Sequence, residues 1–554
     1  MNIDSKLSRR NFIKVCGVGG FSLYLQGDYY NILGNSLSQN SPKDNIGPIE
    51  TIDALSPRKF YGDSFKAAHK YLRDGDPSKI KPTRKEKKRL VIVGGGLSGL
   101  FSASLLKVYD PLILEQGPRL GGNAQAQSWR GLEYPLGSAY VVKPAKGSEI
   151  EALFKQLGLL TLGKSYDTED PSLMDGKLKN DFWRAKDIDA DPKQRSTLIK
   201  YFEDMGSNRN GLVYPEIPVI DESQWEYIKS LDKHSFLSFL ENLLKAPLDP
   251  VIKSYLDNYC YGAFGGSVDE VSAACALNFY CGDQTELMVF PGGNAQITQA
   301  LYNDLDKVLS PGNIRTNELV VSVRVEGQKT FVTSIRSEIR SDLKNETLVV
   351  TETECEAAIM SCPKFVINRV LQDIEPERRA AISKMKYRPY LTANILLNVP
   401  IEKFFYSLRV IESSGFNHMS TDVAYGSFAS NKSNNTVLTI YRPLGREGDR
   451  VKLLEPAAYE RFRKSFEDEL REKVFSVLNL KNSDIFDIRI SRFGHALPLA
   501  APGLLVDDVG PKVRAPFKDR VFFVEQDNWA LPAVETCFLE ASYFRSRVEK
   551  ILNA

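Results

Sequence analysis

The pattern of hydrophobic and polar positions predicts a chain that alternates between strands and helices. Short apolar runs, typical of buried strands, lie at residues 90–93, 111–114 and 521–524. From residue 148 to about 276, apolar residues recur instead at helical spacing, as in residues 150–154. Buried strands mixed with amphipathic helices are typical of an α/β fold.

The second half of the chain is predicted to contain more strands. A long amphipathic helix is expected at residues 459–478, and a final helix from about Pro532 to the C-terminus. Asn294 is expected to cap the N-terminus of an earlier helix. Further strands are expected at residues 319–325, 330–335, 347–351, 357–361, 390–398, 408–411 and 436–441.

The first apolar strand leads directly into a glycine-rich turn. Gly94, Gly96 and Gly99 have G-x-G-x-x-G spacing, which allows a tight turn and close approach of the backbone to a pyrophosphate. The helix that follows points its partly positive N-terminus at the phosphates. Glu115 closes the second strand, where an acid accepts hydrogen bonds from ribose hydroxyls. The sequence thus predicts a site for the ADP half of a dinucleotide, contacted by Gly94, Gly96, Leu97, Ser98, Gly99, Glu115 and Gln116.

Up to Glu115 the motif fits NAD and FAD equally, and the residues that follow distinguish them. Arg119, Gly121 and Gly122 stand at a spacing that resembles the extended fingerprint of the flavin amine oxidase superfamily. Four later segments also resemble that family and occur in its order. They are the Pro-x-Gly-Gly turn at 290–293, the strand at 317–320, the strand return at 357–363 and the C-terminal segment from Asp527 to Pro532.

The resemblance implies an amine-oxidase-like α/β fold. A Rossmann-like FAD-binding domain is expected, interleaved with a substrate domain made of a mixed or antiparallel sheet and helices. The expected boundaries are a signal at 1–26, an N-terminal arm at 27–87, FAD-domain segments at 88–147, 281–370 and 501–554, a helical substrate segment at 148–280 and a substrate sheet and helix at 371–500.

The same resemblance implies contacts with FAD along the whole chain. Val320 is expected to meet the adenine through its backbone, and Asp527 to contact the opposite part of the cofactor. Pro532 suits the first turn of a helix whose N-terminus stabilises the negative charge of reduced flavin. The expected contacts beyond the glycine turn are Arg119, Gly121, Gly122, Gly137, Ser138, Val320, Asp527 and Pro532.

Segments at 60–69, 389–394 and 492–496 resemble a narrower branch, the exported spermidine-dehydrogenase-like proteins. Amine oxidases often place a lysine near flavin N5, on the strand that here carries Asn394. The loss of that lysine favours a dehydrogenase that passes electrons to a cytochrome or quinone over an oxidase that uses oxygen. Two further departures are Glu525 and the pair Trp529-Ala530, where small residues and a histidine are expected in the branch.

Four side chains on segments that the family places near the flavin are candidates for the reacting site. Hydride transfer from the carbon beside a neutral nitrogen needs little acid–base chemistry, so the protein has to supply a dry pocket and orientation. Aromatic faces also hold cationic groups. The alternatives are core packing for the tyrosines and a purely structural role for the histidine. The candidates are Tyr140, Tyr390, His495 and Trp529.

The leading hypothesis is an FAD-dependent oxidoreductase that oxidises the C–N bond of an amine, polyamines included. A second hypothesis keeps FAD but assigns it the desaturation of C–C bonds, as in relatives that act on porphyrinogens or carotenoids. A third hypothesis is a flavin-binding electron-relay protein that turns over no small substrate. A screen of amines against lipophilic polyenes separates the first two, and a flavin that only dithionite reduces would indicate the third.

The N-terminus resembles an export signal. Residues 8–14 match the twin-arginine motif, and a short, glycine-rich, mildly apolar run follows at 15–25. Because this route carries proteins that have already folded, it suits a protein that loads a large cofactor first. The twin-arginine export machinery is therefore an expected partner and the periplasm an expected location. Cleavage, membrane anchoring, a vestigial signal and a chance arginine pair all stay open.

Composition and charge add few constraints. The net charge of +2 gives no indication of nucleic acid binding. The basic run at residues 79–89 is interpreted as a solvated linker, with contact to an acidic partner or a lipid surface as the alternative. Seven scattered cysteines and four histidines lack metal-ligand spacing, so no metal is expected. No cysteine lies between Cys362 and Cys537, where the family's covalent cysteine would stand, so we expect non-covalent FAD.

Overall fold

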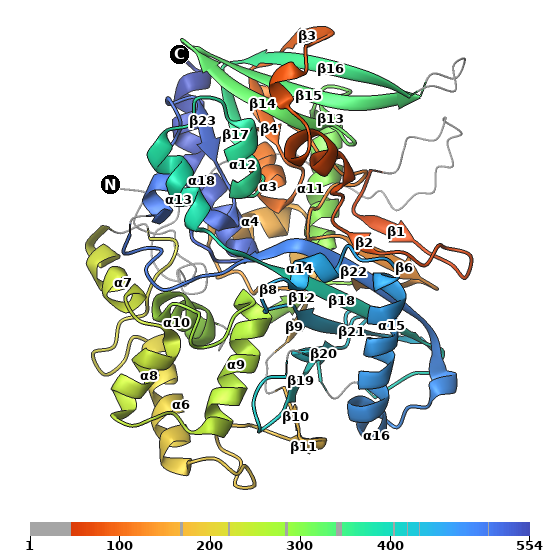
Figure 1. Cartoon of the computed structure of the whole chain (residues 1–554), viewed down its shortest axis with the longest axis vertical. Coiled ribbons are helices and arrows are strands. Elements are labelled where there is room, and N and C mark those ends of the chain that lie inside the picture. Colours follow the sequence, from red (N-terminus) through yellow and green to blue (C-terminus); the bar gives the residue numbers. More distant parts are fainter. Residues whose placement is uncertain are drawn as a thin grey trace.

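The computed structural model describes residues 46–166, 170–219, 222–282, 286–339, 346–402, 405–417, 419–431, 433–507 and 509–554. The predicted export signal lies outside these residues. Figure 1 shows a half built on a parallel sheet at the top, and below it a half with a large sheet and a group of helices. Among the helices of the described ranges, none is long and apolar enough to cross a membrane.

The upper half is centred on a five-stranded parallel sheet. In spatial order its strands are β13 (Ile314–Arg315), β5 (Leu112–Leu114), β4 (Leu90–Val93), β17 (Ala357–Met360) and β23 (Val521–Phe523). Three helices accompany it, and α3 (Leu97–Leu105) packs against both α11 (Ala295–Val308) and α18 (Val534–Leu552). The apolar runs predicted from the sequence form its buried centre, because both faces of a parallel sheet are covered.

A four-stranded sheet in the upper half corrects the interpretation of the basic run at 79–89 as a solvated linker. Arg84–Lys87 form the edge strand β3, which pairs with β16 (Glu346–Cys355), and β15 (Lys329–Ile339) and β14 (Leu319–Glu326) complete the sheet. Acidic residues alternate along and just beyond β16 opposite the basic ones. The ion pairs are Lys85 with Glu352 at 3.8 Å, Lys87 with Glu354 at 3.3 Å and Arg89 with Glu356 at 3.3 Å.

The lower half contains an eight-stranded sheet. Its strands in spatial order are β11 (Lys177–Lys179), β10 (Ser172–Met174), β19 (Ser407–Ile411), β20 (Asp422–Ala424), β21 (Thr436–Pro443), β18 (Tyr387–Leu397), β22 (Ile485–Pro498) and β2 (Tyr61–Gly62). The predicted helix at 459–478 packs on this sheet as α15 (Ala458–Glu469), a π-helical turn at Leu470–Val474 and α16 (Phe475–Leu478). Strands of the two halves alternate along the chain, and the predicted α/β fold class is confirmed.

Helices and small sheets complete the lower half and its junction with the upper one (Figure 1). The helices at the lower left are α6 (Pro192–Gly206), α7 (Trp225–Asp232), α8 (Phe236–Leu244), α9 (Pro250–Phe264) and α10 (Ala273–Gly282). Short helices are α2 (Lys66–Ala68), α4 (Glu149–Gln156), α5 (Leu159–Leu162), α12 (Lys364–Val370), α13 (Pro376–Lys384), α14 (Asp449–Lys452) and α17 (Val509–Arg514). Two three-stranded sheets are formed by β1 (Ile49–Thr51), β6 (Ala126–Trp129) and β7 (Leu132–Pro135), and by β8 (Tyr140–Val142), β12 (Leu287–Val289) and β9 (Lys164–Tyr166).

Candidate functional site

The glycine turn between β4 and α3 has a geometry that only glycine permits at two of its positions. Gly94 has a φ of +111°, and a Cβ atom there would lie 2.6 Å from the carbonyl oxygen of Ser361. A Cβ atom on Gly99 would lie 2.0 Å from the carbonyl oxygen of Gly94. Side chains at these positions would push the turn away from the helix and from the neighbouring strand return. These two glycines therefore fix the shape of the turn.

Gly96 differs, because the space beside it is open. A Cβ atom there would have one neighbour within 4 Å, the Cα atom of Gly122 at 4.0 Å. The Gly121 N–H donates to the Gly95 carbonyl at 2.8 Å, so the two glycine segments lie side by side. Gly96 is also the N-cap of α3, where Leu97 and Ser98 begin the first turn. This open, glycine-lined strip at a helix N-terminus fits a pyrophosphate.

Glu115 links the glycine turn to the end of the second strand. Its Oε2 accepts a hydrogen bond from the Gly95 N–H at 2.8 Å, and its Oε1 accepts one from the Gly117 N–H at 2.6 Å. Burial raises the pKa of Glu115, and these two N–H groups oppose the rise. The Asn317 N–H donates to the Gly117 carbonyl at 2.8 Å. Strand β14, which contains the buried Val320, therefore begins close to this turn. Gln116 is exposed next to Glu115.

Arg119 is held by the N-terminal arm. Its Nη1 donates to the Gly47 carbonyl at 3.2 Å, and its Nη2 lies 4.0 Å from a carboxylate oxygen of Glu50. The strand β1 of this arm pairs with β6, which follows the Gly121-Gly122 loop. The arm therefore fixes the loop that forms the second side of the glycine-lined strip.

The segment with Gly137 and Ser138 returns to the same region and is held by Asn294. The Asn294 side chain donates to the Ser138 Oγ and to the Tyr140 carbonyl, each at 2.7 Å. Asn294 occupies the N-cap position of α11, yet its side chain makes no capping hydrogen bond, so the predicted capping role is wrong. The amide Nδ2 orients the side chain toward the return segment, and the Oδ1, the atom that would accept a capping hydrogen bond, has no hydrogen-bond partner among the described residues.

At the C-terminal segment Asp527 is buried, 3% exposed. Its Oδ2 accepts hydrogen bonds from the Lys364 backbone N–H at 3.0 Å and from the Tyr387 hydroxyl. Pro532 lies before the helix rather than in its first turn, since α18 begins at Val534. The segment nevertheless leads into the helix N-terminus, and it lies at the carboxyl end of β23 beside those of β4 and β17. We call residues 94–96, 121–122, 361–364 and 525–528 the FAD edge.

Residues 97–487 match the family model described as flavin containing amine oxidoreductase. The chain belongs to this family. Oxidoreductase PigB of Serratia sp. (strain ATCC 39006) is 23% identical over 505 residues, covering 81% of this chain and 73% of that protein. The family and the open strip at the FAD edge together identify FAD as the cofactor of this flavoprotein.

Solved structures share the fold of this flavoprotein at low sequence identity. A triple mutant of putrescine oxidase superposes with a TM-score of 0.61 at 15% identity, covering 84% of this chain and 99% of that one. Cyclohexylamine oxidase from Brevibacterium oxydans IH-35A gives 0.60 at 13% identity, with coverages of 84% and 99%. The CLA-producing fatty acid isomerase from P. acnes gives 0.59 at 15% identity, with coverages of 82% and 98%. The fold thus serves proteins with different named substrates.

Two of the four predicted reacting-site residues, Tyr140 and Tyr390, lie in one group with Tyr406 and Tyr441, which we call the tyrosine cluster. The rings of Tyr140 and Tyr406 are 6.3 Å apart, and those of Tyr390 and Tyr441 are 6.4 Å apart. The Tyr441 hydroxyl donates to the carbonyl of Gly137 at 3.4 Å, which joins the cluster to the return segment. Tyr140 is 44% exposed, whereas Tyr390 and Tyr406 are buried.

Asp422 lies beside the tyrosine cluster and was not predicted. It receives hydrogen bonds from the Thr421 Oγ1 at 2.9 Å and the Ser407 Oγ at 3.0 Å. Burial raises the pKa of Asp422 to about 6, against these hydrogen bonds and nearby Arg409. Burial also raises the pKa of the three tyrosines on the large sheet, and the charge of Asp422 adds to each rise, so their hydroxyls stay protonated. The Asp422 carboxylate and the nearby Arg409 guanidinium thus lie beside protonated phenols.

Asn394 lies on the same sheet, next to the return segment. It is fully buried, its Nδ2 donates to the Pro135 carbonyl at 3.1 Å, and its Oδ1 accepts from the Thr439 Oγ1 at 2.7 Å. A neutral, fully hydrogen-bonded amide therefore stands where the family resemblance suggests a lysine.

His495 and Trp529 lie apart from the tyrosine cluster. His495 stacks on Phe365 with the ring centroids 4.1 Å apart, and burial together with Arg450 lowers its pKa to about 4. Trp529 is 3% exposed, and its indole Nε1 donates to Glu540 at 2.9 Å. The family resemblance places the segments of all four candidates near the flavin, and these contacts put His495 and Trp529 in other packing environments than the two tyrosines.

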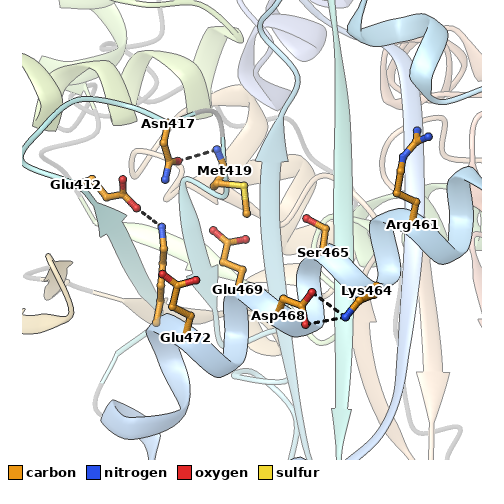
Figure 2. Close-up of a pocket in the computed structure, with 10 residues that line it drawn as sticks. Glu412, Asn417, Met419, Arg461, Lys464, Ser465, Asp468, Glu469 and Glu472 are labelled. Atoms are coloured by element: carbon orange, nitrogen blue, oxygen red, sulfur yellow. Dashed lines mark hydrogen bonds and ion pairs between the residues drawn. The ribbon is translucent and has the colours of Figure 1, made fainter.

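A charged cavity in the lower half is distinct from both regions. Its volume is about 380 Å³, and it is lined by Glu412, Asn417, Met419, Arg461, Lys464, Ser465, Asp468, Glu469, Glu472 and Lys473. Figure 2 shows Lys464 paired with Asp468. Lys473 forms an ion pair with Glu412. No residue of the FAD edge or of the tyrosine cluster lines it.

Proposed function

We propose that this flavoprotein is a dehydrogenase that oxidises the C–N bond of an amine. The observation that carries the proposal is the Asp422 carboxylate beside the tyrosine cluster, which Tyr441 joins to the return segment at Gly137. A carboxylate and aromatic faces are the groups that bind a cationic nitrogen.

Bound FAD supplies a hydride acceptor for the carbon beside a neutral nitrogen. The chain's own residues orient the amine and exclude water from it. The rings of Tyr390, Tyr406 and Tyr441 form apolar walls around the nitrogen, and Asp422 accepts a hydrogen bond from its N–H group. Because Asp422 is ionised above a pH of about 6, it holds this role at neutral pH.

The dehydrogenase assignment rests on Asn394. Its amide is held by the Pro135 carbonyl and Thr439, so this side chain offers no positive charge to activate oxygen at the position suggested for the family's lysine. We propose that a cytochrome or a quinone accepts the electrons, and that the FAD is non-covalent. Flavin that stays with the polypeptide after acid precipitation would contradict the second point.

Polyamines are the first amines to test. Asp170 adds a second carboxylate near Asp422, and its Oδ1 accepts the N–H groups of Tyr406 and Ser407, each at 3.1 Å. Arg409 offsets one of the two charges. One negative charge remains, which favours a substrate with a positive group in addition to the reacting nitrogen.

We also propose export through the twin-arginine pathway, on the motif at residues 8–14. Replacing Arg9 and Arg10 together by lysine is expected to retain the protein in the cytoplasm of a bacterial host. Unchanged fractionation would remove the support for this location.

The competing C–C desaturation keeps support from the shared fold, since the fatty acid isomerase of P. acnes superposes nearly as well as the amine oxidases. The polar side chains near the tyrosine cluster favour an amine over a lipophilic polyene, because a substrate without polar groups would exclude water from Asp422 and add no donor to those of Thr421 and Ser407. This cost is the physical reason for the order of the two hypotheses.

The test is a panel of monoamines, diamines, polyamines and polyenes mixed with the purified holoprotein, with and without oxygen, and followed by flavin absorbance. If an amine bleaches the flavin and air reverses the bleaching only slowly, the result supports an amine dehydrogenase. Bleaching by polyenes alone overturns the amine assignment. Reduction by dithionite but by no organic compound indicates an electron relay.

A further inference from the structure

A buried ion pair lies directly beneath the FAD edge. The side chains of Lys364 and Glu525 are 0% and 6% exposed and form an ion pair with each other. The Lys364 Nζ also donates to the Asn528 Oδ1 at 2.5 Å and lies 4.7 Å from the centre of the Phe523 ring. Charges so deeply buried are costly to desolvate and are kept where they are paired and hydrogen-bonded, as these two are.

The pair joins two segments that leave the parallel sheet at its carboxyl edge. Lys364 begins α12, a few residues after the end of β17, and Glu525 follows β23. The intervening Ser361 carbonyl lies against Gly94, at 2.6 Å from the position of a Cβ atom there. Dinucleotides bind at the carboxyl ends of such strands. The ion pair is therefore part of the support of the cofactor site.

Both members of the pair hold the same residue. The Lys364 backbone N–H donates to the Asp527 carboxylate at 3.0 Å, and the Glu525 carboxylate accepts the Asp527 backbone N–H at 2.7 Å. The Tyr387 hydroxyl is a further donor to Asp527. Lys364 thus fixes the side chain of Asp527, and Glu525 fixes its backbone.

The charge around this pair is unevenly shared. Three buried acids, Glu525, Asp527 and Glu540, adjoin two cations, Lys364 and Arg514, and Arg514 is committed to Glu540 at 2.9 Å. Asn528 connects the two groups, since its amide donates to Glu540 at 2.5 Å while its oxygen accepts from Lys364. Lys364 is thus the cation nearest to Glu525 and Asp527.

We propose that Lys364 and Glu525 are a matched pair of positioning residues for FAD, which fix Asp527 and balance the charge beneath the flavin end of the cofactor. The pairing explains one departure from the family pattern, because the acid at position 525, where a small residue is expected, is neutralised by Lys364. The proposal rests on FAD as cofactor and not on the amine reaction.

A second ion pair provides a matched control. Arg442 on β21 and Glu469 on α15 are 3% and 4% exposed and lie 2.6 Å apart, and the Arg442 guanidinium stacks 3.7 Å from the centre of the Phe466 ring. This pair is as buried as Lys364–Glu525 and also packs on an aromatic ring. It lies in the other sheet, away from the FAD edge.

The experiment compares FAD binding by apoprotein variants, measured by quenching of flavin fluorescence, and the midpoint potential of the refilled proteins, measured by equilibration with reference dyes. Lys364→Met is expected to weaken FAD binding at least tenfold, and the double variant Lys364→Met/Glu525→Gln to recover most of that loss. Glu525→Gln is expected to raise the midpoint potential, because an unbalanced cation stabilises the anionic reduced flavin. Arg442→Met is expected to leave the affinity for FAD within twofold of the wild type. It is also expected to leave the midpoint potential unchanged.

The proposal is overturned if Lys364→Met and Arg442→Met weaken FAD binding equally, or if the double variant binds no better than Lys364→Met. Should Lys364→Met fail to fold, Glu525→Gln decides alone, and an unchanged potential and affinity refute the proposal. A protein that shows the expected binding pattern but is reduced by no amine would retain this inference and lose the proposed function.

Discussion

The FAD edge and the tyrosine cluster are built by different means. At the FAD edge the backbone provides most of the site, through closely spaced glycines: Gly94 and the nearby Gly99 leave no room for a Cβ atom, and Gly96 leaves open space. In the tyrosine cluster side chains provide the site, and they come from strands β8, β18 and β21 and from Tyr406, just before β19, which are up to about 300 residues apart. The first region fits a part that all dinucleotides share, and under the proposed function the second contacts what is specific to a substrate.

The difference shows in how each region uses charge. The FAD edge holds its carboxylates and Lys364 in pairs or against backbone N–H groups. Asp422 instead receives hydroxyl hydrogen bonds, with Arg409 as a nearby cation. A paired charge supports structure, and a carboxylate with spare acceptor capacity can bind a ligand.

The largest expected effect separates two glycines of the same turn. Gly99→Ala is expected to destabilise the protein by about 3 kcal/mol or more, because its Cβ atom would overlap the Gly94 carbonyl. Gly96→Ala is expected to keep the unfolding free energy within about 1 kcal/mol, since its Cβ atom enters open space and its φ of −76° suits alanine. Urea unfolding of the apoproteins measures both.

The same Gly96→Ala variant is expected to bind FAD at least tenfold more weakly, because the methyl group fills the strip assigned to the pyrophosphate. Titration of apoprotein with FAD checks this. Wild-type affinity in a well-folded Gly96→Ala protein would place the pyrophosphate elsewhere.

The second effect concerns the tyrosine cluster. Asp422→Asn is expected to lower kcat/KM for an accepted amine by about 10- to 100-fold, the worth of one charged hydrogen bond, and to leave FAD binding unchanged. In the wild type, kcat/KM is expected to rise as the pH passes about 6, since the ionised carboxylate is the binding form. The Asp422→Asn variant is expected to show no such rise of kcat/KM with pH. Asp170→Asn, which removes the neighbouring carboxylate, serves as the control. Equal pH profiles in wild type and Asp422→Asn would exclude the carboxylate from the site.

The FAD edge can be predicted from sequence further than the tyrosine cluster, because the backbone provides the first and side chains from distant strands provide the second. Gly94, Gly99 and Glu115 could be predicted because their chemistry depends on local spacing. Asp422 could not, because it faces Arg409 and Tyr441 only through the antiparallel register of β19, β20 and β21. The alternation of polar and apolar residues along a predicted strand shows which face of the sheet each side chain lies on. It does not show which strand lies next to it.

Local rules also failed where tertiary contacts compete with them. Asn294 has the right type and position for a helix cap, yet Ser138 and the Tyr140 carbonyl take its side chain. The basic run at 79–89 resembles a solvated linker until the acidic positions of β16 are placed beside it. In both cases the deciding partner lies more than 100 residues away in the sequence, where single-sequence patterns carry no information.

The third prediction concerns His495, at the border of the two regions. Its pKa is lowered from 6.5 to about 4 by burial and Arg450, so the folded protein disfavours the protonated form. Its contribution to stability is full above pH 6.5 and is lost as the pH falls from 6.5 to about 4. His495→Phe, which keeps the stack on Phe365, is expected to remove about 2 kcal/mol of the stability difference between pH 7 and pH 5. Urea unfolding at the two pH values measures it, and an unchanged difference would mean that His495 has the same pKa in the folded and the unfolded protein.

The smallest expected effect tests Trp529, which sequence reasoning placed at the wall of the substrate pocket. Its indole N–H bonds Glu540, and its ring meets Trp225 with the centroids 6.2 Å apart. Glu540 keeps Arg514 and Asn528 as donors when the indole is removed, so Trp529→Phe is expected to cost only about 1 kcal/mol. Trp225→Phe is the matched control. If Trp529 contacts only this buried network, both variants change KM by less than about threefold. A larger change in KM for Trp529→Phe alone would extend the substrate site from the tyrosine cluster to the segment that follows the FAD edge, and the two regions would then meet at this ring.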